Sequence, residues 1–255
     1  MKNIILLMGV FILSCQGQTK KKTKESVSSE TEKTEKSMSK DWIDLFDGKT
    51  FNGWHQFNKS KMSPSWTIVD KAMVFSPNNL GENIGSGKGH NIVTDSLYTN
   101  FELSLEWKIS KGGNSGIFYG VKEDPKYNEA YQTGPEIQVL DNERHPDAKE
   151  NPKFHQAGAL YDLVQPSSDV CNPAESWNLT VLKINHNSNK GSVNLNGTEI
   201  AVFPVNGEPW KKLVSGSKFD DDFFVDFGEF KTGHIGLQDH GDVVSYRNIK
   251  IREID

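Results

Sequence analysis

Hydrophobic and polar residues alternate with a period of two along much of the chain, and no long stretch has the period of a helix. In Phe101–Ile109 a hydrophobic residue occupies every second position, which predicts a strand with one face in a core between two sheets. Further short runs rich in β-branched and aromatic residues lie between Gly, Asn, Asp and Pro, and this predicts an all-β chain. The predicted strands are Trp66–Val69, Met73–Phe75, Phe101–Ile109, Gly116–Val121, Glu136–Leu140, Ala157–Leu163, Trp177–Asn185, Gly191–Leu195, Glu199–Phe203, His234–Gln238 and Val243–Arg252.

So many strands in one domain indicate two stacked sheets. Two of the strands are joined by Asn196–Gly197, the favoured pair for a two-residue hairpin turn. The strands on either side, Gly191–Leu195 and Glu199–Phe203, are therefore expected to pair.

The N-terminal part of the chain lacks this strand pattern. Residues 1–14 contain an apolar run that predicts a signal peptide, too short to span a membrane as a mature helix. The residues up to Cys15 resemble a lipobox, so we expect cleavage before Cys15 and its acylation, which would anchor the chain in a lipid bilayer. An ordinary signal peptide cut elsewhere is the alternative.

Residues 15–39 consist mostly of Gln, Lys, Thr, Ser and Glu without an aromatic residue, which predicts a disordered tether. Gln16, rather than Asp, follows the cysteine. By resemblance to bacterial sorting patterns, this predicts a lipoprotein of the outer membrane in the cell envelope, facing the periplasm.

Residues 40–255 are expected to form one large β-sandwich, because their number is within the range of a single domain of this class. Cys171 is the one cysteine in this part of the sequence, so an intramolecular disulfide is excluded there and stability must come from packing. The net charge is −5 and Lys and Arg are scattered. Nucleic acid is therefore excluded as a partner.

Polar and ionisable side chains gather at three places where predicted strands begin or end. The first is Glu136–Leu140, in which Glu136 and Gln138 share a face by alternation; by itself this could be the solvated face of an edge strand. A predicted loop, residues 141–156, follows it. The other two places are Gly112–Gly116 and Gly236–Gly241. Three such clusters favour a shared cleft.

Several motifs that follow one another along the chain, from Trp42 to Ile254, together resemble the 3-keto-disaccharide hydrolase domain family. They are Trp42–Thr50 with Gly53–Trp54, Gly113–Phe118, Gly134–Asp141, Ala157–Asp162, Glu175–Asn178, Gly236–Gly241 and Tyr246–Ile251. The resemblance implies a concanavalin A-like jelly-roll sandwich of two antiparallel sheets with a carbohydrate cleft on its concave sheet. It also implies action on 3-keto-glycosides as a 1,2-lyase that makes a 3-keto-2-hydroxyglucal, often followed by hydration of that product.

This chemistry explains the residue types. A ketone at C3 acidifies the proton at C2, so a base can remove it and the glycosidic oxygen at C1 leaves by β-elimination. Such a site needs a base, a proton donor for the leaving oxygen and polar groups for the enolate. We expect Glu136 or His145 as the base, Gln138 and His240 as ligands of the enolate or hydroxyls, and Asp141 to orient His145. Further candidates for substrate binding are Asn114, Ser115, His155, Tyr161, Gln238 and, as a stacking platform, Trp54.

Three alternatives remain open at this point. A divalent metal could be bound by Glu136, Asp141, His145 and His155 and polarise the ketone, although their spacing matches no recognised ligand motif. A laminarinase-type glycosidase would need two carboxylates about 5 Å apart, and the usual Glu-x-x-x-Glu pairing is missing. A non-catalytic carbohydrate-binding module would bind sugar without turnover, because fold alone does not fix function.

Overall fold

The computed structural model describes residues 41–78, 89–150 and 153–255. All of them belong to one compact unit, Ser37–Asp255. The predictions on the signal peptide, on Cys15 and on the tether fall outside the described residues. None of the helices in the described ranges is long and apolar enough to cross a membrane.

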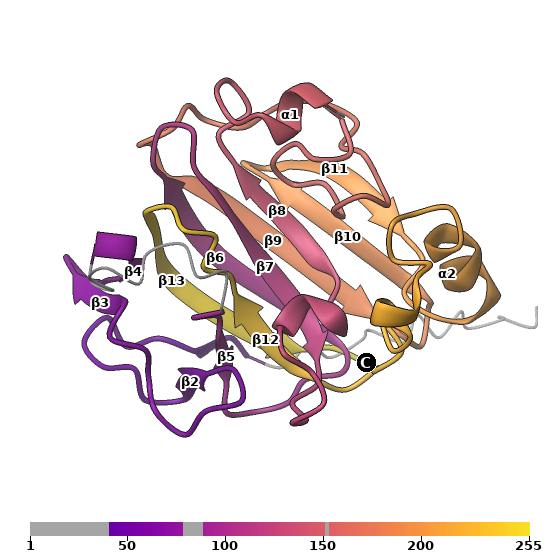
Figure 1. The fold of residues 1–255 in the computed structure, drawn as a ribbon, viewed down its shortest axis with the longest axis horizontal. Coiled ribbons are helices and arrows are strands. Elements are labelled where there is room, and N and C mark those ends of the chain that lie inside the picture. Colours follow the sequence, from indigo (N-terminus) through magenta and orange to yellow (C-terminus); the bar gives the residue numbers. More distant parts are fainter. Residues whose placement is uncertain (1–40, 79–88, 151–152) are drawn as a thin grey trace, which may run out of the picture. The chain divides into compact units, whose positions relative to one another are not determined.

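Two antiparallel sheets make up most of the described unit (Figure 1). The eight-stranded sheet has the order β11 (Thr198–Phe203), β10 (Lys190–Leu195), β9 (Asn178–Asn185), β6 (Phe101–Ile109), β13 (Val244–Glu253), β4 (Ala72–Phe75) and β3 (Trp66–Val69), and β1 (Ile43–Asp44) also pairs with β13. The five-stranded sheet has the order β2 (Trp54–Gln56), β5 (Ile92–Thr94), β12 (His234–Leu237), β7 (Asn114–Val121) and β8 (Glu136–Leu140). The predicted all-β, concanavalin A-like jelly-roll sandwich is confirmed.

Helices are short in this fold. They are α1 (Asp147–Glu150), α2 (Gly207–Val214) and the 3₁₀ turns Ala130–Gln132 and Asp222–Phe224. Elements of this length contain too few turns for a helical period to emerge in the sequence. Tyr131 and Phe224, which lie in the two 3₁₀ turns, line the cavity described below.

The main core lies between the two sheets. Every second side chain of β6, from Phe101 to Ile109, is at most 2% exposed, as the alternation predicts. Ile137 and Val139 of β8 belong to the same core and are fully buried. Burying an aliphatic side chain of this size contributes about 1.5–3 kcal/mol, so this layer is a principal source of stability.

The predicted hairpin is confirmed. Strands β10 and β11 pair with Leu195 opposite Thr198. Asn196 and Gly197 form the turn, with φ angles of 50° and 89°, which is the left-handed region that this turn type requires.

One predicted strand is wrong. Ala157–Leu163 forms turns rather than a strand, because Gly158 and Asp162 have positive φ angles of 83° and 62° and bend the chain. The segment still covers the free edge of β8: the Tyr161 N–H donates to the Glu136 carbonyl at 2.9 Å. This contact brings the Tyr161 side chain to the same end of the sheet as Glu136.

The outer face of the five-stranded sheet faces away from this main core. In register, Phe118 of β7 lies opposite Glu136 of β8, and Gly116 lies opposite Gln138. Glu136 and Gln138 therefore share the outer face, as the alternation predicts. Phe118 belongs to a separate small apolar cluster there.

Candidate active site

A cavity of about 310 Å³ lies on the outer face of the five-stranded sheet. Strands β7, β8 and β12 supply its polar floor, and the loops after β8 and α2 supply aromatic and basic walls. The lining residues are Asn114, Tyr131, Gly134, Glu136, Gln138, Tyr161, Lys218, Phe219, Phe224, Phe227, Gln238 and His240. The three polar places that the sequence analysis singled out thus contribute to one cavity.

Glu136 is the buried acid of this cavity. Gln238 Nε2 donates to Glu136 Oε2 at 3.1 Å. With its amide nitrogen turned to the acceptors that surround it, Gln138 donates to Glu136 Oε1 at 2.9 Å. Each carboxylate oxygen therefore has an amide donor of its own. Burial nevertheless raises the pKa of Glu136 to about 8, against the opposing effects of Lys218 and the Gln238 hydrogen bond.

Gly116, on the strand between β8 and β12, makes room for this carboxylate. A Cβ atom at Gly116 would lie 2.3 Å from Glu136 Oε1 and 2.6 Å from Glu136 Cγ. Contacts this short cannot be accommodated without movement of Glu136. The missing side chain of Gly116 is thus part of the site.

Two buried acceptors of the cavity have no hydrogen-bond partner among the described residues: Asn114 Oδ1 and Gln238 Oε1. Asn114 and Gln238 are 2% and 6% exposed. Leaving a buried acceptor unsatisfied costs about 1–3 kcal/mol, and both atoms belong to residues that line the cavity.

Lys218 is a site residue that the sequence analysis missed. Its Nζ lies 4.0 Å from the centroid of the Tyr161 ring, and its charge acts on Glu136. Partial burial lowers the pKa of Lys218, while Glu136 and Asp162 oppose this shift. No pattern in the sequence singles out a lysine in a loop between α2 and β12, so only the fold could reveal it.

The predicted residues Tyr161 and His155 stack on each other, with ring centroids 4.4 Å apart. His155 Nε2 lies 3.2 Å from Asp162 Oδ1. Tyr161 lines the cavity, whereas His155 lies behind it. His155 thus contacts the Tyr161 ring and is not part of the cavity lining.

Of the two candidate histidines, His240 lines the cavity and His145 does not. The two rings lie edge to face, with centroids 6.5 Å apart. Partial burial of the ring lowers the pKa of His240, although the residue as a whole is exposed. His145 Nδ1 accepts a hydrogen bond from the Asp147 N–H at 3.2 Å, so Asp147, at the start of α1, is its neighbouring acid.

The prediction that Asp141 orients His145 is wrong. The Asp141 carboxylate accepts from the Gly112 N–H at 2.7 Å and from Arg144 Nη1 at 3.2 Å. Burial would raise the pKa of Asp141, but these bonds hold it below its ordinary value. Asp141 thus ties the loop after β8 to the Gly112 turn. Its contact with His145 is a backbone hydrogen bond, in which the His145 N–H donates to the Asp141 carbonyl.

Two further predictions are corrected. Ser115 lies on the core side of β7, because neighbours along a strand point to opposite faces; its Oγ donates to the Gln238 carbonyl at 2.7 Å and lies 2.8 Å from Tyr246 Oη. Trp54 is 4% exposed within the main core, and its Nε1 donates to the Leu45 carbonyl. Neither residue can touch a sugar in this cavity.

One alternative of the sequence analysis was a divalent metal site. Within residues 41–78, 89–150 and 153–255, no group of three His, Cys, Asp or Glu side chains lies close enough to hold a metal ion. The four residues considered for a divalent metal, Glu136, Asp141, His145 and His155, are thus not gathered into such a group. Cys171 is half-buried, and burial raises the pKa of its thiol to about 12.

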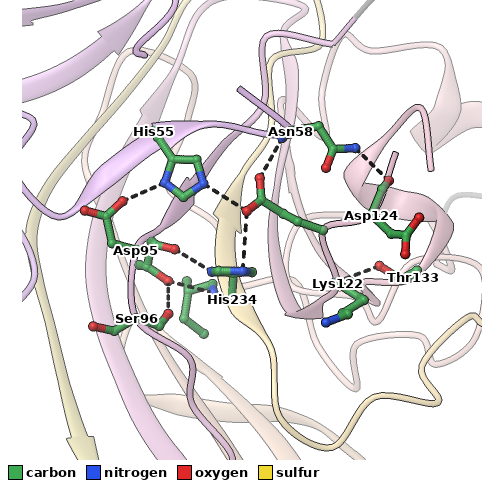
Figure 2. Close-up of polar contacts among 11 residues, drawn as sticks. His55, Asn58, Asp95, Ser96, Lys122, Asp124, Thr133 and His234 are labelled. Atoms are coloured by element: carbon green, nitrogen blue, oxygen red, sulfur yellow. Dashed lines mark hydrogen bonds and ion pairs between the residues drawn. The ribbon is translucent and has the colours of Figure 1, made fainter. Parts of the chain in front are cut away.

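A second polar cluster, which the sequence analysis also missed, surrounds His55 and His234 (Figure 2). The His55 ring lies 2.6 Å from Asp95 Oδ1 and 3.0 Å from Glu123 Oε2. His234 Nδ1 donates to the Thr94 carbonyl at 2.6 Å, and its Nε2 is 3.6 Å from Glu123. None of these residues lines the cavity around Glu136, so this cluster is separate from it.

Comparisons with known proteins agree on one family. Residues 41–252 match the sequence model of the 3-keto-alpha-glucoside-1,2-lyase-like domain. A Bacteroides thetaiotaomicron protein named 3-keto-disaccharide hydrolase is 37% identical over 233 residues, which cover 84% of this chain and 79% of that protein.

Solved structures have the same fold. A crystal structure of a candidate glycosyl hydrolase from Parabacteroides distasonis has 32% identity and a TM-score of 0.74, covering 84% of this chain and 94% of that one. A second from the same organism has 23% identity and a TM-score of 0.62, covering 84% and 100%, and supports the fold alone. Because the family match spans residues 41–252, this chain belongs to the 3-keto-alpha-glucoside-1,2-lyase-like domain family.

Proposed function

We propose that this protein is a carbohydrate-active enzyme that cleaves 3-keto-glycosides by β-elimination across C1–C2, and that water then adds to the product to give net hydrolysis. The observation that carries the proposal is Glu136: a buried carboxyl with a pKa of about 8, held between two amide donors in a cavity. A base whose pKa lies near ambient pH suits the removal of a proton next to a ketone.

In the proposed reaction, Glu136 takes the proton from C2, and the electron pair of the C2–H bond forms an enolate with oxygen at C3. The C1–O bond then breaks as the C1–C2 double bond forms and the C3 ketone is restored. The ammonium group of Lys218 compensates the negative charge that develops on the enolate oxygen. The Glu136 carboxyl, now protonated, returns its proton to the leaving oxygen, and His240, which also lines the cavity, binds a hydroxyl group of the substrate.

The assignment of Glu136 as the base replaces the open choice between Glu136 and His145. It is supported by position, since Glu136 lines the cavity and His145 does not. We assign His145 to the support of the His240 ring, against which it packs edge to face.

The runner-up function, a retaining glycosidase of the laminarinase type, needs two carboxylates about 5 Å apart. Glu136 is the only carboxylate among the described residues that line the cavity. This favours elimination, which needs a single base. The non-catalytic alternative gives no reason for an acid with so high a pKa.

Turnover of paired substrates tests the proposal. The purified protein is incubated with a 3-keto-glucoside and with its unoxidised parent, and the products are followed by mass spectrometry. We expect an unsaturated 3-keto product, or its hydrate, from the ketone alone. Cleavage of both substrates would indicate a glycosidase, and binding without turnover would indicate a binding module.

We also propose that Cys15 is acylated after removal of residues 1–14, and that residues 15–39 tether the enzyme to the outer membrane on its periplasmic side. The support is the lipobox-like sequence that ends at Cys15. Mass spectrometry of the mature N-terminus tests it: a diacylglyceryl-modified Cys15 is expected, and an unmodified residue after position 15 would contradict it.

A further inference from the structure

We propose that Asp162 is a positioning residue for Lys218: it fixes the loop that presents the Lys218 ammonium group to the cavity around Glu136. Asp162 and Lys218 are far apart in the sequence, and Lys218 lines this cavity whereas Asp162 does not. The proposal rests on the proposed function, in which Lys218 compensates the negative charge of the enolate, and it names the contact on which that role depends.

Both oxygens of the Asp162 carboxylate are engaged. The backbone N–H of Lys218 donates to Asp162 Oδ2 at 3.0 Å. His155 Nε2 lies 3.2 Å from Asp162 Oδ1, and because a carboxylate can only accept, His155 is the donor. Asp162 therefore ties the loop after α2 to its own segment, residues 153–164.

Two successive residues hold Lys218 at its two ends. Asp162 accepts from the Lys218 backbone, and the ring of the preceding residue, Tyr161, lies 4.0 Å from Lys218 Nζ. A cation over an aromatic face is attracted to it. A lysine side chain is long and flexible, so holding both its backbone and its ammonium group confines it to one position at the cavity wall.

The segment that holds Lys218 is itself anchored beside Glu136. The Tyr161 N–H donates to the Glu136 carbonyl at 2.9 Å, and Leu160 forms a β-bridge with Ile137. The connection from the proposed base to the ammonium group thus runs through Tyr161 and Asp162 alone. A change at Asp162 is therefore expected to move Lys218 relative to Glu136.

The Asp162 carboxylate also acts on the charge of Lys218. Partial burial lowers the pKa of Lys218, and Glu136 on β8, Asp162 and Asp147 on α1 oppose this shift. The other titratable side chains that line the cavity are Tyr131, Tyr161 and His240, and the acids that follow Lys218 in its own loop are Asp220, Asp221 and Asp222. Loss of the Asp162 charge should therefore lower the pKa of Lys218 further.

The test uses Asp162→Asn, Lys218→Met and the double variant. Asp162 has a φ of 62°, and Asn tolerates this left-handed region, so Asp162→Asn removes the charge and keeps the turn. Lys218→Met keeps the apolar stem and removes the ammonium group. Asp220→Asn, at an exposed acid in the same loop and outside the cavity around Glu136, is the matched control.

Two measurements are made on each variant. The first is kcat and KM for methyl 3-keto-glucoside as a function of pH. The second is an NMR titration of the Lys218 Cε signal, which is assigned by its absence in Lys218→Met.

We expect Asp162→Asn to lower kcat by about three- to tenfold, as for the loss of one hydrogen bond. KM should stay nearly constant, because the enolate charge develops only after binding. The pKa of Lys218 should fall, and with it the pH at which kcat declines on the alkaline side. In the Lys218→Met background, Asp162→Asn should change kcat by less than about twofold, since it acts through Lys218.

Three results would overturn the proposal: an equal loss of kcat in both backgrounds, an unchanged titration of Lys218, or the same changes in Asp220→Asn. The NMR titration needs no turnover, so it separates this proposal from the proposed function. If no 3-keto substrate reacts but the pKa of Lys218 falls in Asp162→Asn and not in Asp220→Asn, Asp162 holds Lys218 and the lyase activity is wrong. If 3-keto substrates react while Asp162→Asn changes neither kcat nor the titration, the activity stands and Asp162 is not a positioning residue.

Discussion

Gln238 and Glu136 are joined across an intervening strand: the amide of Gln238, at the end of β12, donates to Glu136 on β8 at 3.1 Å, over Gly116 of β7. The amide thus holds the carboxylate directly above the middle strand. Because this bond favours the charged form of Glu136, it lowers the pKa of Glu136, whereas burial raises this pKa. Together with burial and Lys218, Gln238 therefore sets how much of Glu136 is ionised, and so available as a base, at a given pH.

Removing this amide is expected to move the pH profile. In Gln238→Leu the pKa of Glu136 rises above about 8, so the midpoint of the rise of kcat with pH shifts to higher pH. The measurement is kcat for a 3-keto-glucoside between pH 5 and pH 10. Gln165→Leu, at an exposed position outside the cavity, should leave the midpoint in place; a lower kcat with an unshifted midpoint would mean that Gln238 has only a structural role.

Replacing the base itself is expected to remove most of the turnover. Glu136→Gln keeps the shape of the side chain but cannot take a proton, so kcat should fall by about 10²- to 10⁴-fold. Steady-state assays with a 3-keto-glucoside measure it, with Glu199→Gln, exposed on β11, as the matched control. Turnover within a factor of a few of the wild type would rule Glu136 out as the base.

The same substitution is expected to change how stability depends on pH. Because the pKa of Glu136 is raised from 4.5 to about 8, the folded protein binds a proton that the unfolded chain releases between these values. Its free energy of unfolding should therefore decrease as the pH rises from about 4.5 to about 8, by up to a few kcal/mol from this group.

Urea unfolding of wild type and Glu136→Gln across this pH range measures the effect. The variant should lose less stability with rising pH and be the more stable protein, relative to the wild type, at pH 8. Parallel curves for the two proteins would show that Glu136 titrates with an ordinary pKa.

The cluster around His55 predicts a pH dependence of the same sign, in a pH range that begins at about 6.5. Burial alone would lower the pKa of His55, but its bonds to Glu123 and Asp95 raise it above 6.5. A raised histidine pKa contributes stability that is complete below the unfolded value and is lost as the pH rises through the folded value. In Glu123→Gln the pKa of His55 should fall, and NMR titration of the ring protons measures this.

His234 is a second reporter of the Glu123 charge in that experiment. Burial lowers its pKa, with Glu123 opposing the shift, so the pKa of His234 should also fall in Glu123→Gln. A variant in which both histidines titrate as in the wild type would show that Glu123 is not bonded to His55 in solution.

The strands were predictable because alternation is a local property of the sequence. It identified β6, the hairpin of β10 and β11, and the shared face of Glu136 and Gln138. The same rule could have excluded Ser115 as a substrate-binding residue. Because β7 begins at Asn114, the side chains of Asn114 and Ser115 must point to opposite faces of the sheet.

The remainder of the site depends on contacts between distant segments. Lys218 lies in the loop after α2, and nothing local in the sequence distinguishes it from other exposed lysines. Trp54 was expected as a stacking platform for the substrate, but it begins the three-residue strand β2 and is buried. A strand of three residues is too short for alternation to reveal.

The vacant position at Gly116 also limits how this site could be transferred to another protein. A carboxylate placed at the equivalent of Glu136 on a similar sandwich would collide with any side chain on the neighbouring strand, since even a methyl group would lie 2.3 Å from its oxygen. The glycine would have to be introduced before, or together with, the acid. The shortest route to this chemistry on a new scaffold is therefore a double substitution, and a screen of single substitutions would not find it.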